Sequence, residues 1–366
     1  MTQDFLFSDF YPPPQTEGIK YAGSKLKIIP FILDCIEPYN FCDVLDGFAG
    51  TTRVGQAFAQ RGMSVTSNDI SAWSEVFGNC YFKSEREDEF YAKIINELNK
   101  LDGMNGWFTQ NYGGDENDVK KPFQIHNTRK LDAIREYIDH LNLSFVDKSV
   151  ILTSLILAMD AVDNTIGHFS SYLSKWSPRS YHTMVMKLPR RFATDTNKHT
   201  VLKEDIFDAI KHKSYDFVYL DPPYGSNNEK MPPSRVRYSA YYHIWTSIIL
   251  NDKPVLFGKA GRRQDSRDTV SSSIFEEFRK DKSGHYIAIN AIKSMLQHVQ
   301  SDYIMLSYSS GGRATKQDLM DCINTEGKLV KAIEIDYKKN VMANMKWTNE
   351  WANDCKNQEY LFLIKK

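Results

Sequence analysis

The sequence predicts an α/β fold: an open, mostly parallel sheet with a mainly helical insertion. Three observations predict it. An apolar strand at 43–46 runs into a glycine turn and a helical segment, and a second strand follows at 64–69, which is a strand–helix–strand opening. Helical periodicity then dominates the segment 75–189. Strand patterns resume only near residue 200 and alternate with helix-length segments towards the end of the chain.

The later strands are expected at six short apolar runs, namely 200–202, 216–220, 254–257, 303–308, 329–337 and 360–364. No spacer of strong helical periodicity separates the last two runs. We therefore expect these two strands to pair antiparallel at an edge of the sheet.

The insertion is expected to contain helices at 90–98, 128–142 and 150–162, with a Gly/Asn loop at 103–114. The run 150–162 is the most apolar of the chain, but Thr153, Ser154 and Asp160 interrupt it. It is also shorter than the ~20 residues that a membrane helix needs. We expect a buried helix there and no association with a membrane.

The composition is that of an ordinary globular protein of 366 residues, in which 46 basic residues balance 46 acidic ones. Any contact with nucleic acid must therefore come from a local basic patch. The five cysteines are scattered without the spacing of metal ligands. We expect reduced thiols, no bound metal and a cytoplasmic protein.

The sharpest local signal is the segment Leu220-Asp-Pro-Pro-Tyr-Gly225, which follows an apolar strand. The two prolines stiffen the turn and lack N–H donors, so Asp221 and the Pro222 carbonyl remain as acceptors beside the ring of Tyr224. A strand-ending turn with a helix-capping Asp is the alternative. Because ligands bind at the carboxyl edge of such sheets, we favour a site for a planar base with an exocyclic amine. Tyr224 would stack on that base, and a base in a duplex would have to be flipped out to reach it.

The second signal is the segment Asp43–Gly55, a glycine turn that follows the first strand. Such a turn lets the backbone approach a ligand closely, and Thr51 or Thr52 can cap the helix that follows. Asp69 comes 23 positions after Asp46, close to the ~20-residue offset at which an acid usually meets ribose hydroxyls. The turn has neither a Gly-Lys-Ser/Thr nor a GxGxxG pattern, which argues against a phosphate loop and against a dinucleotide.

Two weaker segments each have two interpretations. The basic stretch Gly18–Lys27 is either a loop that caps a helix at 26–36 or a binding loop. The acids Glu204 and Asp205 end the strand at 200–202, and they either cap a helix or contact a ligand.

Taken in order, the segments KYAGSK, DGFAGTT, the acid Asp69, EDIF and LDPPYG resemble the Dam-type (alpha-group) adenine-N6 DNA methyltransferases. The segments Ser307–Ser310 and Glu359–Lys365 are also similar to the C-terminal pattern of that family. The resemblance implies a Rossmann-like, S-adenosylmethionine-dependent methyltransferase sheet. It implies a discontinuous catalytic domain at 1–74 and 200–366, interrupted at 75–199 by a target-recognition and DNA-binding region.

The resemblance also implies roles for individual residues. Asp221, Pro222 and Tyr224 would be catalytic and would hold the reacting base. Those that would bind S-adenosylmethionine are Lys20, Tyr21, Ala22, Gly23 and Lys25 at its methionine end, Asp46, Phe48, Ala49 and Gly50 around it, Asp69 at its ribose, and Asp205 and Ile206 at its adenine ring. One departure is that Thr52 stands where the turn of the family commonly has a second glycine.

Double-stranded DNA is the expected partner, and two windows beside the Asp-Pro-Pro-Tyr turn could bind it. In 167–213 and 225–263, basic residues outnumber acidic ones and tyrosines are interleaved with them, as on surfaces that bind phosphates and stack bases. The candidate DNA contacts are Arg179, Arg190, Arg191, Lys230, Arg235 and Arg237. A solvated charged face is the alternative.

We therefore expect methyl transfer to the N6 amine of a flipped-out adenine in duplex DNA, for restriction–modification or epigenetic marking, with a cognate restriction endonuclease as a further partner. Methylation of an RNA adenine is the alternative. Methylation of a protein glutamine is disfavoured because such enzymes typically carry Asn where Asp221 stands. A non-catalytic DNA-binding protein on the same fold is disfavoured by the presence of both Asp221 and Tyr224.

Overall fold

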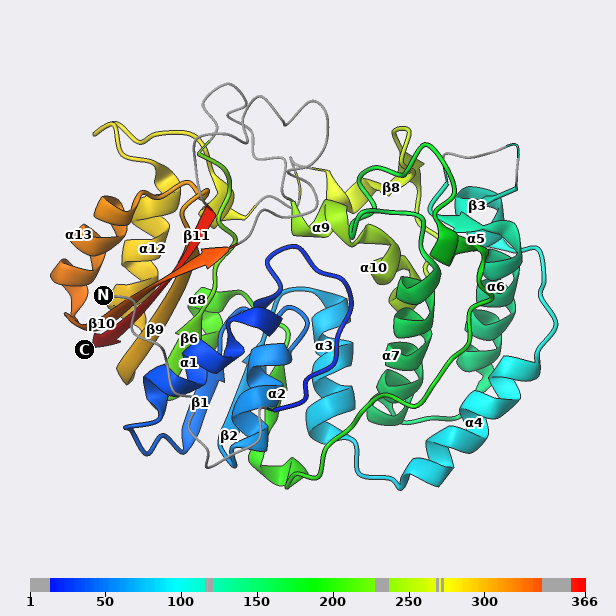
Figure 1. Ribbon diagram of the computed structural model, residues 1–366, viewed down its shortest axis with the longest axis horizontal. Coiled ribbons are helices and arrows are strands. Elements are labelled where there is room, and N and C mark those ends of the chain that lie inside the picture. Colours follow the sequence, from blue (N-terminus) through cyan, green and yellow to red (C-terminus); the bar gives the residue numbers. More distant parts are fainter. Residues whose placement is uncertain are drawn as a thin grey trace.

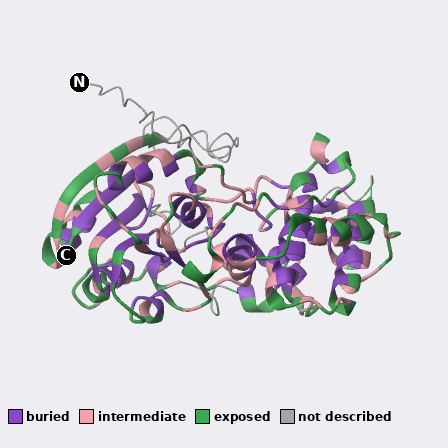
Figure 2. Cartoon of the chain, turned by 90° about the horizontal axis from the view of Figure 1, so that it is seen from below, coloured by how far each residue is buried: buried purple, intermediate pink, exposed green. Residues whose placement is uncertain are grey.

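The computed structural model describes residues 14–115, 117, 121–227, 237–267, 270, 273–337 and 357–366. A mixed sheet with helices on both faces forms one half of the molecule, and a group of helices forms the other (Figure 1). Buried residues fill both halves (Figure 2). Among the described residues, no helix is both long enough and apolar enough to cross a membrane.

The central sheet is mostly parallel, as the sequence predicts. Among the described residues its strand order is β10 (Lys328–Tyr337), β11 (Asn357–Lys365), β9 (Ser301–Ser309), β6 (Tyr215–Leu220), β1 (Asp43–Asp46), β2 (Ser64–Asn68) and β5 (Thr200–Leu202). Strand β11 runs antiparallel to both of its neighbours, and the other pairs are parallel. The predicted antiparallel pairing of the last two strands at an edge is confirmed by β10 and β11.

Alternate side chains of the strands feed two apolar cores, one on each face of the sheet. In β6, Phe217 and Tyr219 pack into one core, and Val218 and Leu220 pack into the other. The first core is covered by α1 (Ile29–Ile36), α2 (Arg53–Gln60) and α3 (Ala72–Gly78). The second is covered by α8 (Ile206–Ala209), α12 (Ile287–His298) and α13 (Lys316–Glu326).

The chain between β2 and β5 is mainly helical. After α3 it forms a π-helical turn (Asn79–Lys83), α4 (Asp88–Lys100), α5 (Trp107–Tyr112), α6 (Ile125–His140) and α7 (Phe145–Val162), with β3 (Gly113–Gly114), β4 (Phe123–Gln124) and two 3₁₀ turns (Pro178–Tyr181 and Thr196–Lys198). The predicted loop at 103–114 is wrong in part, because α5 lies within it. Asp132 of α6 accepts hydrogen bonds from the backbone N–H groups of Phe108 and Thr109 and so caps α5 from outside.

The helical segment shares its core with the sheet. One cluster of buried residues contains Phe58 of α2, Phe77 of α3 and Leu152 of α7. Helices α9 (Tyr238–Tyr241) and α10 (His243–Leu250) follow β6 in sequence but lie with the helical half (Figure 1). The Arg135 side chain of α6 donates to the carbonyls of Ile248 and Ile249, which ties the end of α10 to that half.

The strand predicted at 254–257 is wrong as a member of the central sheet. Only β7 (Leu256–Phe257) forms, and it pairs with β8 (Arg262–Arg263) in a small separate hairpin. The remaining described elements are 3₁₀ turns at Lys25–Lys27, Gln264–Ser266 and Ile274–Glu276. An apolar run of strand length therefore did not identify its partner, because pairing depends on neighbours that are distant in sequence.

Candidate active site

The site lies where β1 and β6 end side by side. These strands are parallel neighbours, with Asp46 opposite Tyr219, so the loops that leave them emerge at the same edge. From β1 the sheet extends through β2 in one direction and through β6 in the other. A reversal of strand order of this kind opens a crevice at the carboxyl edge of an α/β sheet, where ligands bind.

The glycine turn after β1 is held by both neighbouring strands. The N–H of Gly47 donates to the Tyr219 carbonyl of β6, and the N–H of Ala49 donates to the Asn68 carbonyl of β2. The N–H of Gly50 donates to the Asp69 carboxylate at 2.9 Å. Asp69, expected at a ribose, is therefore also a support for this turn.

Two positions of the turn depend on backbone conformation and space. A Cβ at Gly47 would lie 2.9 Å from side-chain carbons of both Ile206 and Leu220, so only glycine fits without movement. Thr52 adopts a left-handed conformation with φ of 60°, which a β-branched residue rarely does. The predicted threonine cap is wrong for α2, since no side-chain hydrogen bond caps this helix. Instead Thr52 accepts a hydrogen bond from Gln56.

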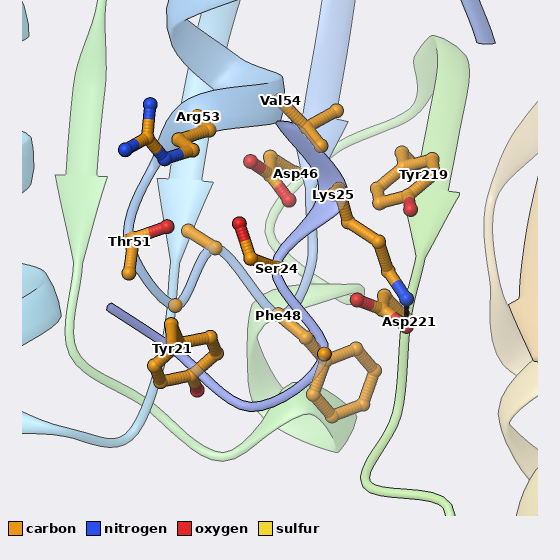
Figure 3. Close-up of a pocket in the computed structure, with 13 residues that line it drawn as sticks. Tyr21, Ser24, Lys25, Asp46, Phe48, Thr51, Arg53, Val54, Tyr219 and Asp221 are labelled. Carbon is orange, nitrogen blue, oxygen red and sulfur yellow. Dashed lines mark ion pairs between the residues drawn. The ribbon is translucent and has the colours of Figure 1, made fainter. Parts of the chain in front are cut away.

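A pocket opens between this turn, the loop before α1 and the end of β6 (Figure 3). It is lined by Tyr21, Gly23, Ser24, Lys25, Asp46, Phe48, Ala49, Gly50, Thr51, Arg53, Val54, Tyr219 and Asp221. The structure thus brings together Asp221 and seven of the predicted cofactor residues, which are Tyr21, Gly23, Lys25, Asp46, Phe48, Ala49 and Gly50.

Asp46 is an acid with little access to solvent, 1% exposed, in the wall of this pocket. Its carboxylate accepts a hydrogen bond of 2.9 Å from the N–H of Gly55. Burial raises the pKa of Asp46 to about 8, and the negative charges of Asp221 and Asp69 act in the same direction. A cationic group of a ligand placed beside Asp46 would favour its ionised form and lower this pKa again.

Asp221 lies in a compact cluster with Lys25, Glu359 and Tyr224. The Lys25 ammonium is 3.0 Å from Asp221 and 2.6 Å from Glu359. The Tyr224 hydroxyl lies within hydrogen-bonding distance of both Asp221 and, at 2.6 Å, Glu359, and it can donate its single proton to one of them at a time. Ser307 of β9 donates to the same Glu359 oxygen at 2.9 Å.

Burial and the neighbouring charges shift the pKa values of Asp221 and Lys25. Burial raises the pKa of Asp221 to about 6, with Lys25 lowering it and Glu359 raising it. Burial acts to lower the pKa of Lys25, but the carboxylates of Asp221 and Glu359 raise it to about 12. From the sequence, the Asp-Pro-Pro-Tyr turn was expected to present only hydrogen-bond acceptors. This expectation is wrong, because the Lys25 ammonium and the Tyr224 hydroxyl already bind Asp221.

The ring of Tyr224 has two neighbours at this site. Its centroid is 4.7 Å from that of Tyr308, with the two planes tilted by 51°, and the Lys25 ammonium lies at its hydroxyl end, 4.8 Å from the centroid. Stacking of Tyr224 on a base stays a prediction. Pro222 is buried at the start of the turn.

An aromatic cluster joins the loop before α1 to the helical half of the molecule. The ring centroid of Tyr21 lies 4.7 Å from that of Tyr242, 5.3 Å from that of Tyr238 and 5.4 Å from that of Trp73. The N–H of Ala22 donates to the Tyr242 hydroxyl at 2.7 Å. Ala22 therefore helps to position the pocket loop through its backbone.

Other predicted cofactor residues lie outside the pocket lining. The Lys20 ammonium binds Asp163 at 2.8 Å and the Asp160 carbonyl at the end of α7, so the structure directs it away from the pocket. Asp205 is exposed and accepts a hydrogen bond from the N–H of Phe207, which is the capping interpretation. The Ile206 side chain packs below Gly47.

Most of the described candidate DNA contacts are engaged within the protein. Arg179 pairs with Asp163, Arg191 pairs with Asp88, and Arg237 pairs with Glu276 with only 8% of its side chain exposed. Acids from outside the basic windows bind these three arginines and partly neutralise their charges. Their role as DNA contacts stays a prediction. The Arg190 side chain is 77% exposed, and its Nε atom makes a long ion pair of 3.9 Å with Oε1 of Glu17. Lys230 and Arg235 lie outside the described residues.

The sequence reasoning missed Glu359, Ser307 and Tyr219 as site residues. A signal for Glu359 existed, because strand alternation places it on the same face of β11 as the buried Leu361 and Leu363. An acid on an apolar face needs partners. Also missed were the pocket-lining residues Ser24, Thr51, Arg53 and Val54.

The strand order and this site are consistent with a methyltransferase fold that acts on an amino group. The family model for the D12 class N6 adenine-specific DNA methyltransferases matches residues 21–300. The match covers well over half of the chain, and the protein belongs to this family. It is an adenine-specific DNA methyltransferase, and the comparisons give no support to RNA as its substrate.

Several curated proteins are similar along nearly the whole chain. The type II methyltransferase M.NlaIII of Neisseria lactamica is 25% identical over 357 residues, which cover 95% of this chain and 99% of that protein. M.CviAII of Paramecium bursaria Chlorella virus 1 is 26% identical over 358 residues, covering 94% and 98%. M.FokI of Planomicrobium okeanokoites is 24% identical over 370 residues, and the chain spans about half of it, 53%.

Proposed function

We propose that this DNA methyltransferase takes its methyl group from S-adenosylmethionine and transfers it to a flipped-out adenine in duplex DNA, whose N6 amine donates to Asp221 and the Pro222 carbonyl. The observation that carries the proposal is the position of Asp221 in the pocket wall, across from the glycine turn. The Lys25 ammonium, 3.0 Å away, favours the ionised form of Asp221, and an ionised carboxylate accepts hydrogen bonds only.

The pocket residues fit S-adenosylmethionine. The buried Asp46 carboxyl can take the methionine ammonium, and Phe48 and Val54 supply apolar surface. The Tyr219 hydroxyl is buried in the pocket wall beside Ser307, and it can serve a polar group of a ligand. Tyr21, Gly23, Ala49 and Gly50 would hold the cofactor by shape and backbone.

The outer part of the cofactor site is proposed at Asp69 and Ile206. Asp69 accepts hydrogen bonds from Gly50 and Ser71, and its two carboxylate oxygens have further lone pairs for ribose hydroxyls. Lys20 and Lys25 are less suited to the methionine carboxylate, because carboxylates of this chain already bind both ammonium groups.

When bound, the cofactor supplies an electrophilic methyl group on a sulfonium. The adenine amine is a weak nucleophile because its lone pair is conjugated into the ring. Hydrogen bonds to Asp221 and the Pro222 carbonyl would orient the nitrogen, and the carboxylates would stabilise the positive charge that develops on it. As the N–C bond forms, the S–C bond of the cofactor would break and leave a neutral thioether, and the nitrogen would then lose one proton to solvent. No covalent intermediate with the protein is needed.

DNA recognition is proposed for the helical segment 75–199, which shares a core with the sheet. Tyr242, which follows this segment in sequence, connects it to the pocket loop, because its hydroxyl donates to the Gly167 carbonyl and accepts from the N–H of Ala22. The relatives named type II methyltransferases favour a role in restriction–modification with a cognate endonuclease. Such an enzyme would work in the cytoplasm.

The test is transfer of tritiated methyl from S-adenosylmethionine to unmethylated duplex DNA, with ribosomal RNA assayed in parallel. Label recovered as N6-methyladenine from the duplex is the expected result. No incorporation, or label in methylcytosine, would contradict the proposal. Single-molecule sequencing of the methylated DNA would then identify the recognition sequence.

A further inference from the structure

Glu359 is a buried carboxylate at the start of β11, with 9% of its side chain exposed. A single oxygen, Oε1, accepts from the Lys25 ammonium at 2.6 Å, from the Tyr224 hydroxyl at 2.6 Å and from the Ser307 hydroxyl at 2.9 Å. The partners come from the loop before α1, the turn after β6 and strand β9. Glu359 therefore connects three segments at the methyl-transfer site.

The strand itself does not need this carboxylate. The backbone of β11 pairs with β9 from Glu359 to Lys365 and with β10 on its other side. Burial of a charge is costly unless it is paired. The cost is incurred next to Asp221, and two of the three donors to Glu359, Lys25 and Tyr224, also bind Asp221.

Both shared donors contact one oxygen of Asp221, Oδ1. A carboxylate has two oxygens with lone pairs, so Oδ2 remains for a target amine as long as the two donors stay where they are. Without a second acceptor, the Lys25 ammonium and the Tyr224 hydroxyl would have only Asp221 to bind, and they would compete with the amine for Oδ2. Glu359 is that second acceptor.

We propose that Glu359 is a positioning residue of this enzyme: it holds the Lys25 ammonium and the Tyr224 hydroxyl at Oδ1 of Asp221, so that the second oxygen of Asp221 stays available to the target amine. The inference rests on the proposed role of Asp221 and names the group that makes this role compatible with the observed ion pairs. Ser307 supports the arrangement by fixing the Glu359 oxygen.

The inference also has an electrostatic consequence. The groups that face Asp221 are Lys25 from the loop before α1, Glu359 from β11, Tyr224 from its own turn, Asp46 from β1, Tyr219 from β6, Tyr21 and Tyr238. The Glu359 charge raises the pKa of Asp221. Removal of that charge favours the ionised form of Asp221, so it must move the acidic limb of the rate profile to lower pH.

The experiment compares Glu359→Gln and Glu359→Ala with Glu334→Gln, a matched control on the neighbouring strand β10 whose carboxylate binds the exposed Lys316. The kcat and KM for DNA are measured from pH 5 to 9, with thermal unfolding of each variant. We expect kcat to fall about 10-fold in Glu359→Gln and about 100-fold in Glu359→Ala. We expect the acidic limb in Glu359→Gln to move at least about half a pH unit lower.

A Glu359→Gln enzyme with the kcat and acidic limb of Glu334→Gln would overturn the inference. If Glu359→Ala does not fold, Ser307→Ala is the second variant, and a kcat equal to that of the wild type would likewise overturn it. Asp221→Asn separates the two proposals. Activity retained in Asp221→Asn contradicts the proposed function itself, whereas an inactive Asp221→Asn beside a normal Glu359→Gln contradicts only the role of Glu359.

Discussion

Asp46 and Asp221 at the carboxyl edge of the sheet are paired differently from Asp147 and Asp132 in the helical segment. At the sheet edge, burial raises the pKa of Asp46 and Asp221, which lie near other negative charges. In the helical segment, burial acts to raise the pKa of Asp147, but hydrogen bonds from Ser144, Tyr91 and Arg86 lower it. Asp160 of α7, next to Lys20, follows the sheet-edge pattern, because burial raises its pKa to about 7. An acid with its own full set of donors stabilises the fold, and an acid with too few is available to a ligand.

Asp132 shows the helical pattern most clearly. Its carboxylate accepts from the N–H groups of Gly106, Phe108 and Thr109 and from the Thr109 hydroxyl. These donors are the otherwise unpaired N–H groups at the start of α5. Asp221, by contrast, shares its donors with Glu359. The difference between the two regions can be tested by substitution at each.

The largest effect is expected for Asp221→Ala. Loss of the acceptor for the target amine should reduce methyl transfer at least about 100-fold, with affinity for S-adenosylmethionine within a few fold of the wild type. The measurements are tritium incorporation and calorimetric binding of the cofactor. Unchanged activity would show that the sheet-edge acid is as structural as those of the helical segment.

Asp46→Asn should stabilise the fold in a pH-dependent manner. The folded pKa of about 8 lies above the ordinary value of 3.8, so Asp46 is neutral in both the folded and the unfolded state below about pH 4 and costs no stability there. As the pH rises to 8, only the unfolded state ionises readily, and the wild type loses stability. Asn carries no charge and retains an acceptor for the Gly55 N–H. The stability gain should grow from near zero at pH 4 to about 3–5 kcal/mol at pH 8. Urea unfolding at both pH values measures it, and a pH-independent difference would contradict it.

Asp132→Ala should instead destabilise the protein. The N–H groups at the start of α5 would lose their acceptor, at a cost of about 2–3 kcal/mol in the free energy of unfolding. Because Asp132 does not line the pocket, kcat per folded molecule should stay the same. Chemical denaturation and active-site titration together separate these quantities. A lower kcat in fully folded Asp132→Ala would contradict the claim that the acids of the helical segment serve stability alone.

Tyr224→Phe should have a smaller effect than loss of Asp221. It keeps the ring beside Tyr308 but removes the hydroxyl that bridges Asp221 and Glu359. We expect kcat to fall about 10-fold, the loss typical of one hydrogen bond to a charged group. Steady-state kinetics measure it, with Tyr224→Ala as the comparison for the ring. A larger fall in Tyr224→Phe than in Asp221→Ala would reverse the assigned roles.

The smallest effect is expected for Arg190→Ala. Its side chain is largely exposed and only loosely paired with Glu17, so stability should change by less than about 0.5 kcal/mol. If Arg190 binds a DNA phosphate as proposed, the salt dependence of DNA affinity should fall by about one charge. Arg191→Ala is the contrast, because loss of its pairing with Asp88 should destabilise the helical segment.

The sequence predicted the parts of the protein that depend on neighbouring residues. The continuous apolar run of β6, the stiff Asp-Pro-Pro-Tyr turn and the antiparallel end of the sheet could be predicted from short segments. The pairing of the 254–257 strand and the ion pairs of Arg179 and Arg191 could not be predicted, since their partners lie elsewhere in the chain. A charge count over a sequence window includes basic residues that are paired with acidic residues from outside the window.

The amino-acid sequence by itself determined the sheet, its ligand-binding edge and the family, because strand periodicity, proline stiffness and glycine turns act over a few residues. Only the tertiary structure decided which charges meet. Lys25 and Glu359 are 334 positions apart, yet they share a hydrogen bond beside Asp221. Electrostatic interactions depend on distance in space and on burial, and neither can be read from the order of residues along the chain.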